Sequence, residues 1–182
     1  SNYFGVSLTA GDFNADGKTD LAVGAHGYSS FTGRAYIFYN DGSIPTTAAT
    51  ADVTITGEAT TNFFGVSLTA GDFNADGKTD LAVGAYGYTT NTGRTYIFYN
   101  GSITTENASG ADVTITGETT SNYFGVSLTA GDFNADGKTD LAVGAYGYTT
   151  NTGRTYIFYN GSITTENASG ADVTITGETT SN

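Results

Sequence analysis

The stretch FGVSLTAGDFNADGKTDLAVGA, residues 4–25, decides the fold because it occurs three times in the chain. It returns unchanged at residues 64–85 and 124–145, so the spacing is 60 residues. Strict self-similarity at a fixed period is the signature of a repeat architecture. The chain of 182 residues is therefore interpreted as three repeats followed by the first two residues of a fourth. The predicted repeats are 1–60, 61–120 and 121–180.

Each repeat reads as four short strands joined by turns. Apolar and polar or small residues alternate along residues 4–10, 21–25 and 52–57, whereas residues 34–39 are rich in aromatic and branched side chains. No helical periodicity is present. We therefore predict an all-β protein built from β-propeller blades, three four-stranded antiparallel blades per chain. The alternative is a β-sandwich or a solenoid of stacked hairpins, which rarely repeats its sequence so strictly.

Composition and charge exclude several classes of function. The chain carries 18 acidic and 6 basic residues, a formal charge of -12, so it has no basic face for a nucleic acid or an anionic membrane surface. No apolar run is long enough to cross a bilayer, so membrane insertion is not expected. The absence of cysteine excludes disulfides and zinc-thiolate sites. His26 is the only histidine, which excludes His-based catalytic pairs within one chain.

The loop DFNADGKTD, residues 12–20, carries the chemistry of each repeat. Oxygen-bearing side chains fall at its first, third, fifth and ninth positions, glycine at the sixth allows a sharp turn, and the seventh can offer its backbone carbonyl. An all-oxygen set at this spacing fits Ca²⁺ and disfavours zinc or copper. We predict about one Ca²⁺ per repeat. The predicted metal ligands are Asp12, Asn14, Asp16, Lys18 and Asp20, then Asp72, Asn74, Asp76, Lys78 and Asp80, then Asp132, Asn134, Asp136, Lys138 and Asp140.

Other interpretations of this loop are weaker. A hydrophilic turn would not require three carboxylates within nine residues, since their mutual repulsion needs a cation to offset it. An EF-hand would place a bidentate glutamate at the twelfth position, where this chain has Val23. A pair of glycosidase carboxylates would not be repeated identically three times, and calcium-bound carboxylates are poor proton carriers. No catalytic residues and no enzymatic activity are therefore predicted.

The order of motifs resembles the FG-GAP repeat of integrin α-subunit propellers and related bacterial proteins. Phe4-Gly5, the calcium-type loop and Gly24-Ala25 follow one another as in that family, and the resemblance covers all three repeats. It implies that each loop holds one calcium, which rigidifies one face while ligands meet the opposite face. The sequence departs from the motif at the last position of its Gly-Ala-Pro part, where proline is replaced by His26, Tyr86 or Tyr146.

Three blades are too few for a closed propeller, which needs about 4–8. We therefore expect two chains to join head to tail as a homodimer that forms a six-bladed ring. The segment GETTSN at residues 177–182 supports this expectation, because it repeats the segment that links the second repeat to the third.

The predicted function is a calcium-binding, non-catalytic propeller module that serves as a scaffold for adhesion or interaction, with a protein or glycan ligand. The alternatives are a calcium-containing, carbohydrate-binding, lectin-like propeller, or an engineered or truncated repeat array with no ligand. Tyr86, Tyr88, Asn91 and Arg94 could form a recognition surface, although packing between blades and pairing of the arginine with an acidic neighbour is the favoured interpretation. An extracellular or cell-surface location, in a bacterial source, is expected from the Thr- and Asn-rich composition without cysteine.

Overall fold

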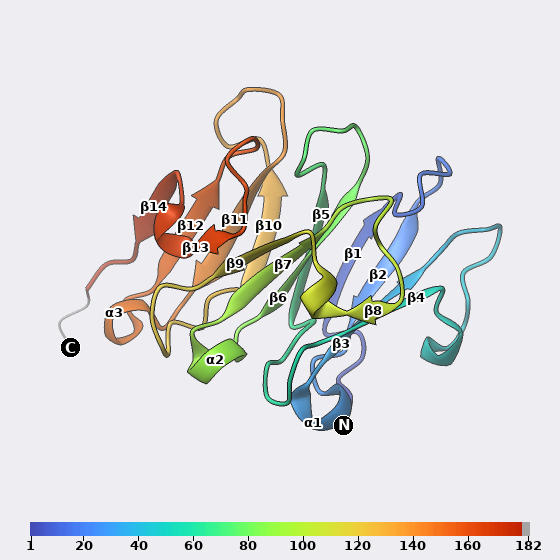
Figure 1. Cartoon of the computed structure of the whole chain (residues 1–182), viewed down its shortest axis with the longest axis horizontal. Coiled ribbons are helices and arrows are strands. Elements are labelled where there is room, and N and C mark those ends of the chain that lie inside the picture. The colour runs from blue at the N-terminus through green and yellow to red at the C-terminus, as the bar shows by residue number, and fades with distance from the viewer. Residues whose placement is uncertain (180–182) are drawn as a thin grey trace.

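The computed structural model describes residues 1–179 and shows an all-β chain in which three sheets stand side by side (Figure 1). Residue 180 of the third predicted repeat and the overhang 181–182 lie outside the described residues. The first blade contains β1 (Ser7–Gly11), β2 (Asp20–Gly24), β3 (Arg34–Phe38) and β4 (Val53–Thr56). The second contains β5 (Ser67–Gly71), β6 (Asp80–Ala85), β7 (Arg94–Phe98) and β9 (Val113–Thr116). The third contains β10 (Ser127–Gly131), β11 (Asp140–Ala145), β12 (Arg154–Phe158) and β14 (Val173–Thr176).

The four strands of each blade pair antiparallel in chain order, as predicted for propeller blades. The sequence prediction missed a fifth strand in two of the sheets. The two-residue strand β8 (Glu106–Asn107) pairs in parallel with β4, and β13 (Glu166–Asn167) pairs in parallel with β9. Each of these strands, called a strap below, comes from the repeat that follows the blade it joins. A two-residue strand is too short to show a period-two pattern, so its sequence carries no signal.

The first strand begins later than predicted. Residues 4–6 form a turn and the strand starts at Ser7, because Gly5 adopts the left-handed region at φ 91°. Glycine populates that region readily, whereas other residues rarely do. The corresponding Gly65 and Gly125 have φ values of 83° and 84°, so all three blades enter their first strand through the same turn.

Single helical turns link the second and third strands of each blade: α1 (Tyr28–Phe31), α2 (Tyr88–Asn91) and α3 (Tyr148–Asn151). Their central residues, such as Thr89 and Thr90, have positive φ, so these turns are not regular right-handed helices. Short 3₁₀ turns, η1 (Ala48–Thr50), η2 (Ala108–Gly110) and η3 (Ala168–Gly170), precede the fourth strands. Among residues 1–179, no helix has both the length and the apolar character needed to cross a membrane.

Most of the hydrophobic core lies between neighbouring blades, and a smaller cluster of Val23, Ala25, Tyr36 and Phe38 lies on the outer side of the first blade. The side of a blade that faces the next repeat is called its forward face; in the first blade Ala22, Ile37 and Ile55 belong to it. The opposite side is called its rear face; in the second blade it includes Phe64 and Val83, which pack on that forward face. A second cluster joins the second and third blades in the same way. Because each of the two larger clusters needs two blades, a single repeat can bury only part of its apolar faces.

Small residues in the second strand permit this close packing. Ala22 is fully buried, and a Cβ added to Gly24 would overlap the backbone of Gly65 in the next blade. The Ser7 hydroxyl donates a hydrogen bond of 2.8 Å to the Gly65 carbonyl at the same place. Ser67 and Gly125 repeat this bond at 2.7 Å between the second and third blades. The blades therefore touch backbone to backbone along these strands.

Candidate metal centre

The three acidic loops lie at one end of the blades, as the loops at the top of Figure 1 show. Each connects the first and second strands of its blade, and the register of that hairpin places Gly11 opposite Asp20. The turns α1, α2 and α3 lie at the other end (Figure 1). Each acidic loop therefore joins two antiparallel strands, whereas the calcium loop of an EF-hand lies between two helices.

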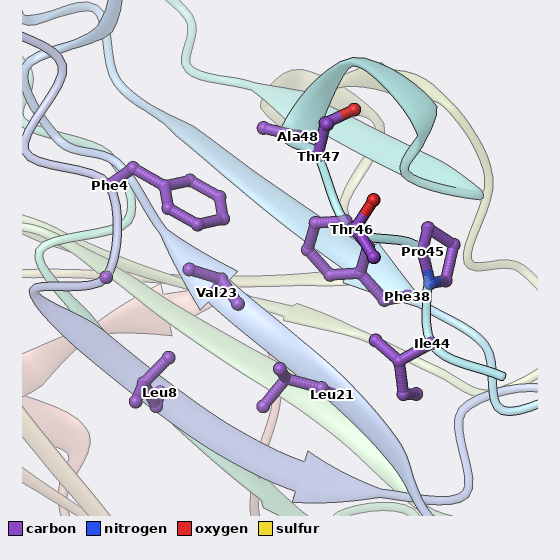
Figure 2. Close-up of a pocket in the computed structure, with 11 residues that line it drawn as sticks. Phe4, Leu8, Leu21, Val23, Phe38, Ile44, Pro45, Thr46, Thr47 and Ala48 are labelled. Carbon is purple, nitrogen blue, oxygen red and sulfur yellow. The ribbon is translucent and has the colours of Figure 1, made fainter.

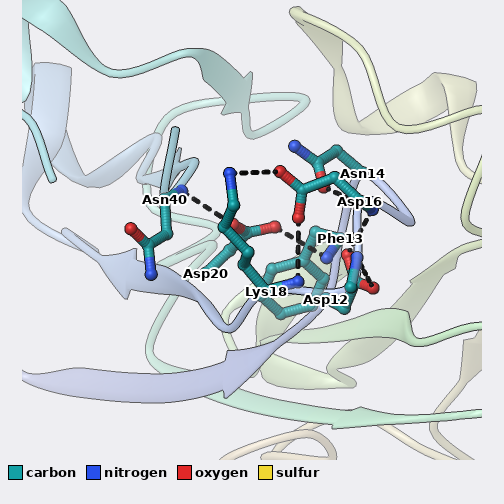
Figure 3. Close-up of polar contacts among 8 residues, drawn as sticks. Asp12, Phe13, Asn14, Asp16, Lys18, Asp20 and Asn40 are labelled. Atoms are coloured by element: carbon teal, nitrogen blue, oxygen red, sulfur yellow. Dashed lines mark hydrogen bonds and ion pairs between the residues drawn. The ribbon is translucent and has the colours of Figure 1, made fainter. Parts of the chain in front are cut away.

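Carboxylate oxygens organise the first loop by accepting backbone hydrogen bonds (Figure 3). Asp12 accepts the N–H of Asp16 through Oδ1 at 3.0 Å and the N–H of Gly17 through Oδ2 at 2.9 Å. Asp16 Oδ1 accepts the N–H of Lys18 at 2.9 Å, which lowers the pKa of Asp16. Asn14 Oδ1 also accepts from Asp16 N–H, at 3.1 Å. The loop therefore brings Asp12, Asn14 and Asp16 together around its own backbone.

The same bonds recur in the second and third loops. Asp72 and Asp132 each accept two loop N–H groups, at 2.8–3.0 Å. Asp76 and Asp136 each accept the N–H of the lysine two residues later, at 2.9 Å. Since the three loops have one sequence and one bonding pattern, the geometry is set locally and does not depend on the position of the blade.

The last aspartate of each loop anchors it to the blade. Asp20 is buried and accepts the N–H of Phe13 at 2.9 Å and the N–H of Asn40 at 2.8 Å, one on each oxygen. Asp80 is bonded in the same way to Phe73 and Asn100. Burial raises the pKa of Asp80 to about 6, although these two N–H groups favour its charged form. The buried carboxylates thus fix where the loop leaves the sheet.

The donor chemistry of the loops fits Ca²⁺, but residues 1–179 contain no preassembled group of three or more His, Cys, Asp or Glu side chains around one point. The carboxylates instead accept loop N–H groups, and the Lys18 ammonium lies 3.4 Å from Asp16 Oδ2. Each carboxylate oxygen keeps a second lone pair, so the side chains can still coordinate a cation. The loops are exposed and all their donors are oxygen atoms, which is what a hard cation requires. The fifteen ligand assignments made from the sequence therefore stay a prediction.

Aromatic rings line the opposite end of the blades, at the positions where the motif departs from proline. His26 stacks on Tyr3, with ring centroids 4.9 Å apart, and Tyr86 stacks on Phe63 at 4.6 Å. Tyr146 stacks on Tyr123 at 4.7 Å. The residue that stands in place of the proline is thus part of an aromatic stack in all three repeats. Burial lowers the pKa of His26.

The Tyr and Arg side chains between the second and third strands join neighbouring blades. The Arg94 guanidinium lies 3.7 Å above the Tyr88 ring and donates to Glu58 of the preceding repeat at 3.1 Å. The Tyr96 hydroxyl donates to the same Glu58 oxygen at 2.8 Å. The interpretation that this arginine pairs with an acidic neighbour is confirmed. The sequence analysis did not identify the partner, although glutamate recurs after the fourth strand at positions 58, 118 and 178.

Replacing Glu118 with alanine is expected to lower the free energy of unfolding by about 2–3 kcal/mol, because Arg154 and the buried Tyr156 hydroxyl would both lose their acceptor. Urea unfolding monitored by circular dichroism measures this change. Glu178→Ala is the matched control, since no hydrogen bond to Glu178 occurs within the described residues. Measured on protein diluted until it is monomeric, it should change the free energy of unfolding by less than about 0.5 kcal/mol. Equal losses for both variants would contradict the expected role of Glu118.

Sequence comparison supports the same architecture. The FG-GAP repeat signature matches residues 4–38, 64–98 and 124–158, one match in each blade. Phosphatidylinositol-glycan-specific phospholipase D of Bos taurus is 36% identical over 154 residues, which cover 78% of this chain and 18% of that protein. Integrin alpha-PS2 of Drosophila melanogaster is 34% identical over 169 residues, covering 87% of this chain and 12% of the integrin. Integrin alpha-M of Mus musculus is 37% identical over 154 residues, covering 81% and 13%.

The chain spans less than a fifth of the length of each of these relatives. The similarity is therefore to their repeats and not to the proteins as a whole. Because the signature occurs in all three blades and covers more than half of the residues, the chain belongs to the FG-GAP repeat family.

Proposed function

We propose that this chain is a calcium-binding, non-catalytic propeller module that serves as an adhesion or interaction scaffold outside the cell or at its surface. The observation that supports it best is that three loops of identical sequence, whose possible metal ligands are all oxygen atoms, lie at the same end of the blades. In this proposal each loop binds one Ca²⁺, and a protein or glycan ligand binds at the opposite end.

Charge supports the calcium part of the proposal. Nine of the 18 carboxylates lie in the three loops, so half of the acidic charge is concentrated at one end of the molecule. Like charges held this close destabilise the folded state unless cations offset them. Three Ca²⁺ ions would change the formal charge from -12 to -6. Asp12, Asn14, Asp16, Asp20 and the Lys18 carbonyl would hold the ion in the first loop, and the equivalent residues would do so in the others.

The non-catalytic part rests on the side chains away from the loops. The lone histidine, His26, is stacked on Tyr3, and the described residues give it no acidic hydrogen-bond partner. The Arg94 and Tyr96 side chains hold Glu58 and so join two blades. One of the relatives is named as a phospholipase D, but the chain covers only 18% of that protein. Its activity is therefore not carried over to these repeats.

Calcium is expected to bind with a stoichiometry of three per chain in isothermal titration calorimetry on the metal-free protein. Bound calcium should also raise the thermal unfolding temperature, because binding to the folded state alone adds about 2.7 kcal/mol per site at a free concentration 100 times Kd. A chelator should reverse the change.

Two triple variants make this test specific. Asp16→Asn, Asp76→Asn and Asp136→Asn together keep an oxygen acceptor for the lysine N–H but remove one charge from each loop, so calcium binding should be strongly weakened. Asp52→Asn, Asp112→Asn and Asp172→Asn make the same change of charge outside the loops and should leave binding intact. No heat of binding, or an equal loss in both variants, would contradict calcium binding by the loops.

A further inference from the structure

The two outermost faces of the three blades resemble the inner faces in sequence, but no further blade covers them among residues 1–179. Phe4, on the rear face of the first blade, is 49% exposed, whereas the equivalent Phe64 is 0% exposed because the first blade covers it. Phe133, at the forward face of the third blade, is 44% exposed, whereas the equivalent Phe73 is 1% exposed. Residues 4–25 recur unchanged in the other two repeats, so the difference in exposure comes from the missing neighbour.

The rear face of the first blade is also hollowed. An open apolar pocket of about 210 Å³ lies on this face. Phe4, Leu8, Leu21 and Phe38 line it from the blade (Figure 2). Ile44 and Pro45 close it from the loop before the fourth strand. In the second blade, the equivalent side chains are covered by the forward face of the first blade. The equivalents of these four side chains therefore form one half of an inner joint between blades.

The forward face of the third blade carries the other half. Ile175 is exposed there, whereas its equivalents Ile55 and Ile115 are fully buried against the following blade. The two exposed faces are apolar in the same places where the inner joints are apolar. An exposed apolar face of this kind on a soluble domain marks an interaction surface.

Polar groups at the two ends are complementary as well. Between inner blades, a serine hydroxyl bonds a glycine carbonyl, a glutamate bonds an arginine and a tyrosine, and an asparagine amide bonds an aspartate carbonyl. On the third blade, the groups equivalent to the first partner of each bond are the Ser127 hydroxyl, the Glu178 carboxylate and the Asp132 carbonyl. On the first blade, the groups equivalent to the second partner of each bond are the Gly5 carbonyl, the Arg34 and Tyr36 side chains, and the Asn40 amide.

We propose that the forward face of the third blade binds the rear face of the first blade of a second copy of this chain. The occupant is a second copy because this joint continues the two joints already present inside the chain, with the same residues on both sides. Two such contacts, one at each end, close two chains into a six-bladed ring. Glu178 of each chain then bonds Arg34 and Tyr36 of the other, as Glu58 bonds Arg94 and Tyr96 within the chain.

One element of the inner joints is missing at the joint between chains. The strap residue Asn107 donates its side-chain amide to the Gly57 carbonyl of the preceding blade, and Thr47 stands at the equivalent position of the first repeat. Pro45 replaces Thr105, whose hydroxyl accepts the N–H of Thr54. The joint between chains therefore lacks the strap, and it is expected to dissociate on dilution before the blades themselves unfold.

The mass in solution tests the proposal. Light scattering after size-exclusion chromatography should give the mass of two 18.7 kDa chains, falling toward one chain on dilution. A mass of one chain at high protein concentration would overturn the proposal. A mass of three or more chains would overturn closure by two copies.

Two charge substitutions test which faces are in contact. Leu8→Asp alters only the rear face of the first blade and Ile175→Asp only the forward face of the third. Each should weaken the dimer about 100-fold or more, because the aspartate would be buried without a partner. Both side chains are exposed in the single chain, so both variants should keep the far-ultraviolet circular dichroism of the original chain.

Mixing the two variants gives the sharpest result. The Leu8→Asp chain keeps an intact third blade and the Ile175→Asp chain keeps an intact first blade, so one good joint can form between them. A 1:1 mixture should therefore recover dimers that neither variant forms alone. A dimer that survives either substitution, or a mixture that gives no more dimer than either variant alone at high protein concentration, would overturn the head-to-tail arrangement. Glu178→Ala, which should leave the folding of the monomer unchanged, should weaken the dimer about tenfold or more.

Discussion

Replacing Gly84 with alanine is expected to lower the free energy of unfolding by about 3 kcal/mol, the upper part of the range for overpacking. The added Cβ would overlap the Gly125 carbonyl of the next blade and the Ser67 hydroxyl. Because the obstacle is backbone, the third blade would have to move away from the second. Urea unfolding followed by circular dichroism measures the loss, which is a large part of the stability of an ordinary domain.

Gly144→Ala is the matched control, because Gly144 occupies the same position in the third blade. There the added Cβ would come close only to the Ser127 side chain, which can turn away. The expected loss is under about 1 kcal/mol. Both substitutions should be made on the Leu8→Asp background, so that no second chain covers the third blade. Equal losses at the two glycines would show that contact between blades is not what requires glycine.

The second large effect is expected for Phe124→Ala, with a loss of about 3–5 kcal/mol. Phe124 is fully buried between the second and third blades and meets the Tyr156 and Phe158 rings edge to face, with centroids 5.3 and 6.4 Å away. Truncation to alanine would leave a cavity that two packed sheets cannot readily close. Calorimetric or urea unfolding of the purified variant gives the value directly.

Phe4→Ala provides the comparison within the same molecule. Phe4 makes the equivalent contacts with Tyr36 and Phe38, at 5.5 and 6.3 Å, but no blade within the described part of the chain covers its other side. On the Ile175→Asp background, which keeps the chain monomeric, its loss should be about half that of Phe124→Ala. A loss as large as that of Phe124→Ala would contradict the assignment of the core to the space between blades.

The strands were predictable because their signal is local. Alternation along Leu8 and Ala10, or along Val53 and Ile55, is visible within a few residues, and the repeat allows it to be read three times. The later start of the first strand was missed because Gly5 at positive φ breaks a pattern that the side chains alone would continue. The straps were missed because their pairing partner, β4 or β9, lies in the preceding repeat and β8 and β13 have only two residues.

At the candidate site, too, some features could be predicted from the sequence and others could not. The spacing within residues 12–20 indicated which side chains gather at the loop, and the structure places Asp12, Asn14 and Asp16 there. The sequence could not show that the buried Asp20 also bonds the N–H of Asn40, because that contact depends on the third strand returning beside the loop. The partner of Arg94 was missed for a similar reason, since Glu58 lies 36 residues earlier and meets it only when two blades pack.

The straps make neighbouring blades depend on one another when they unfold. Since β8 is covalently part of the second repeat but completes the sheet of the first, the first blade cannot keep its outer strand fully paired once the second has opened. This coupling runs in one direction along the chain, and β14 of the third blade has no strap within the described residues. Cooperativity between nearest neighbours of this kind makes local opening start at the end where the last contact is missing. In the single chain, fraying therefore begins at the third blade and spreads toward the first.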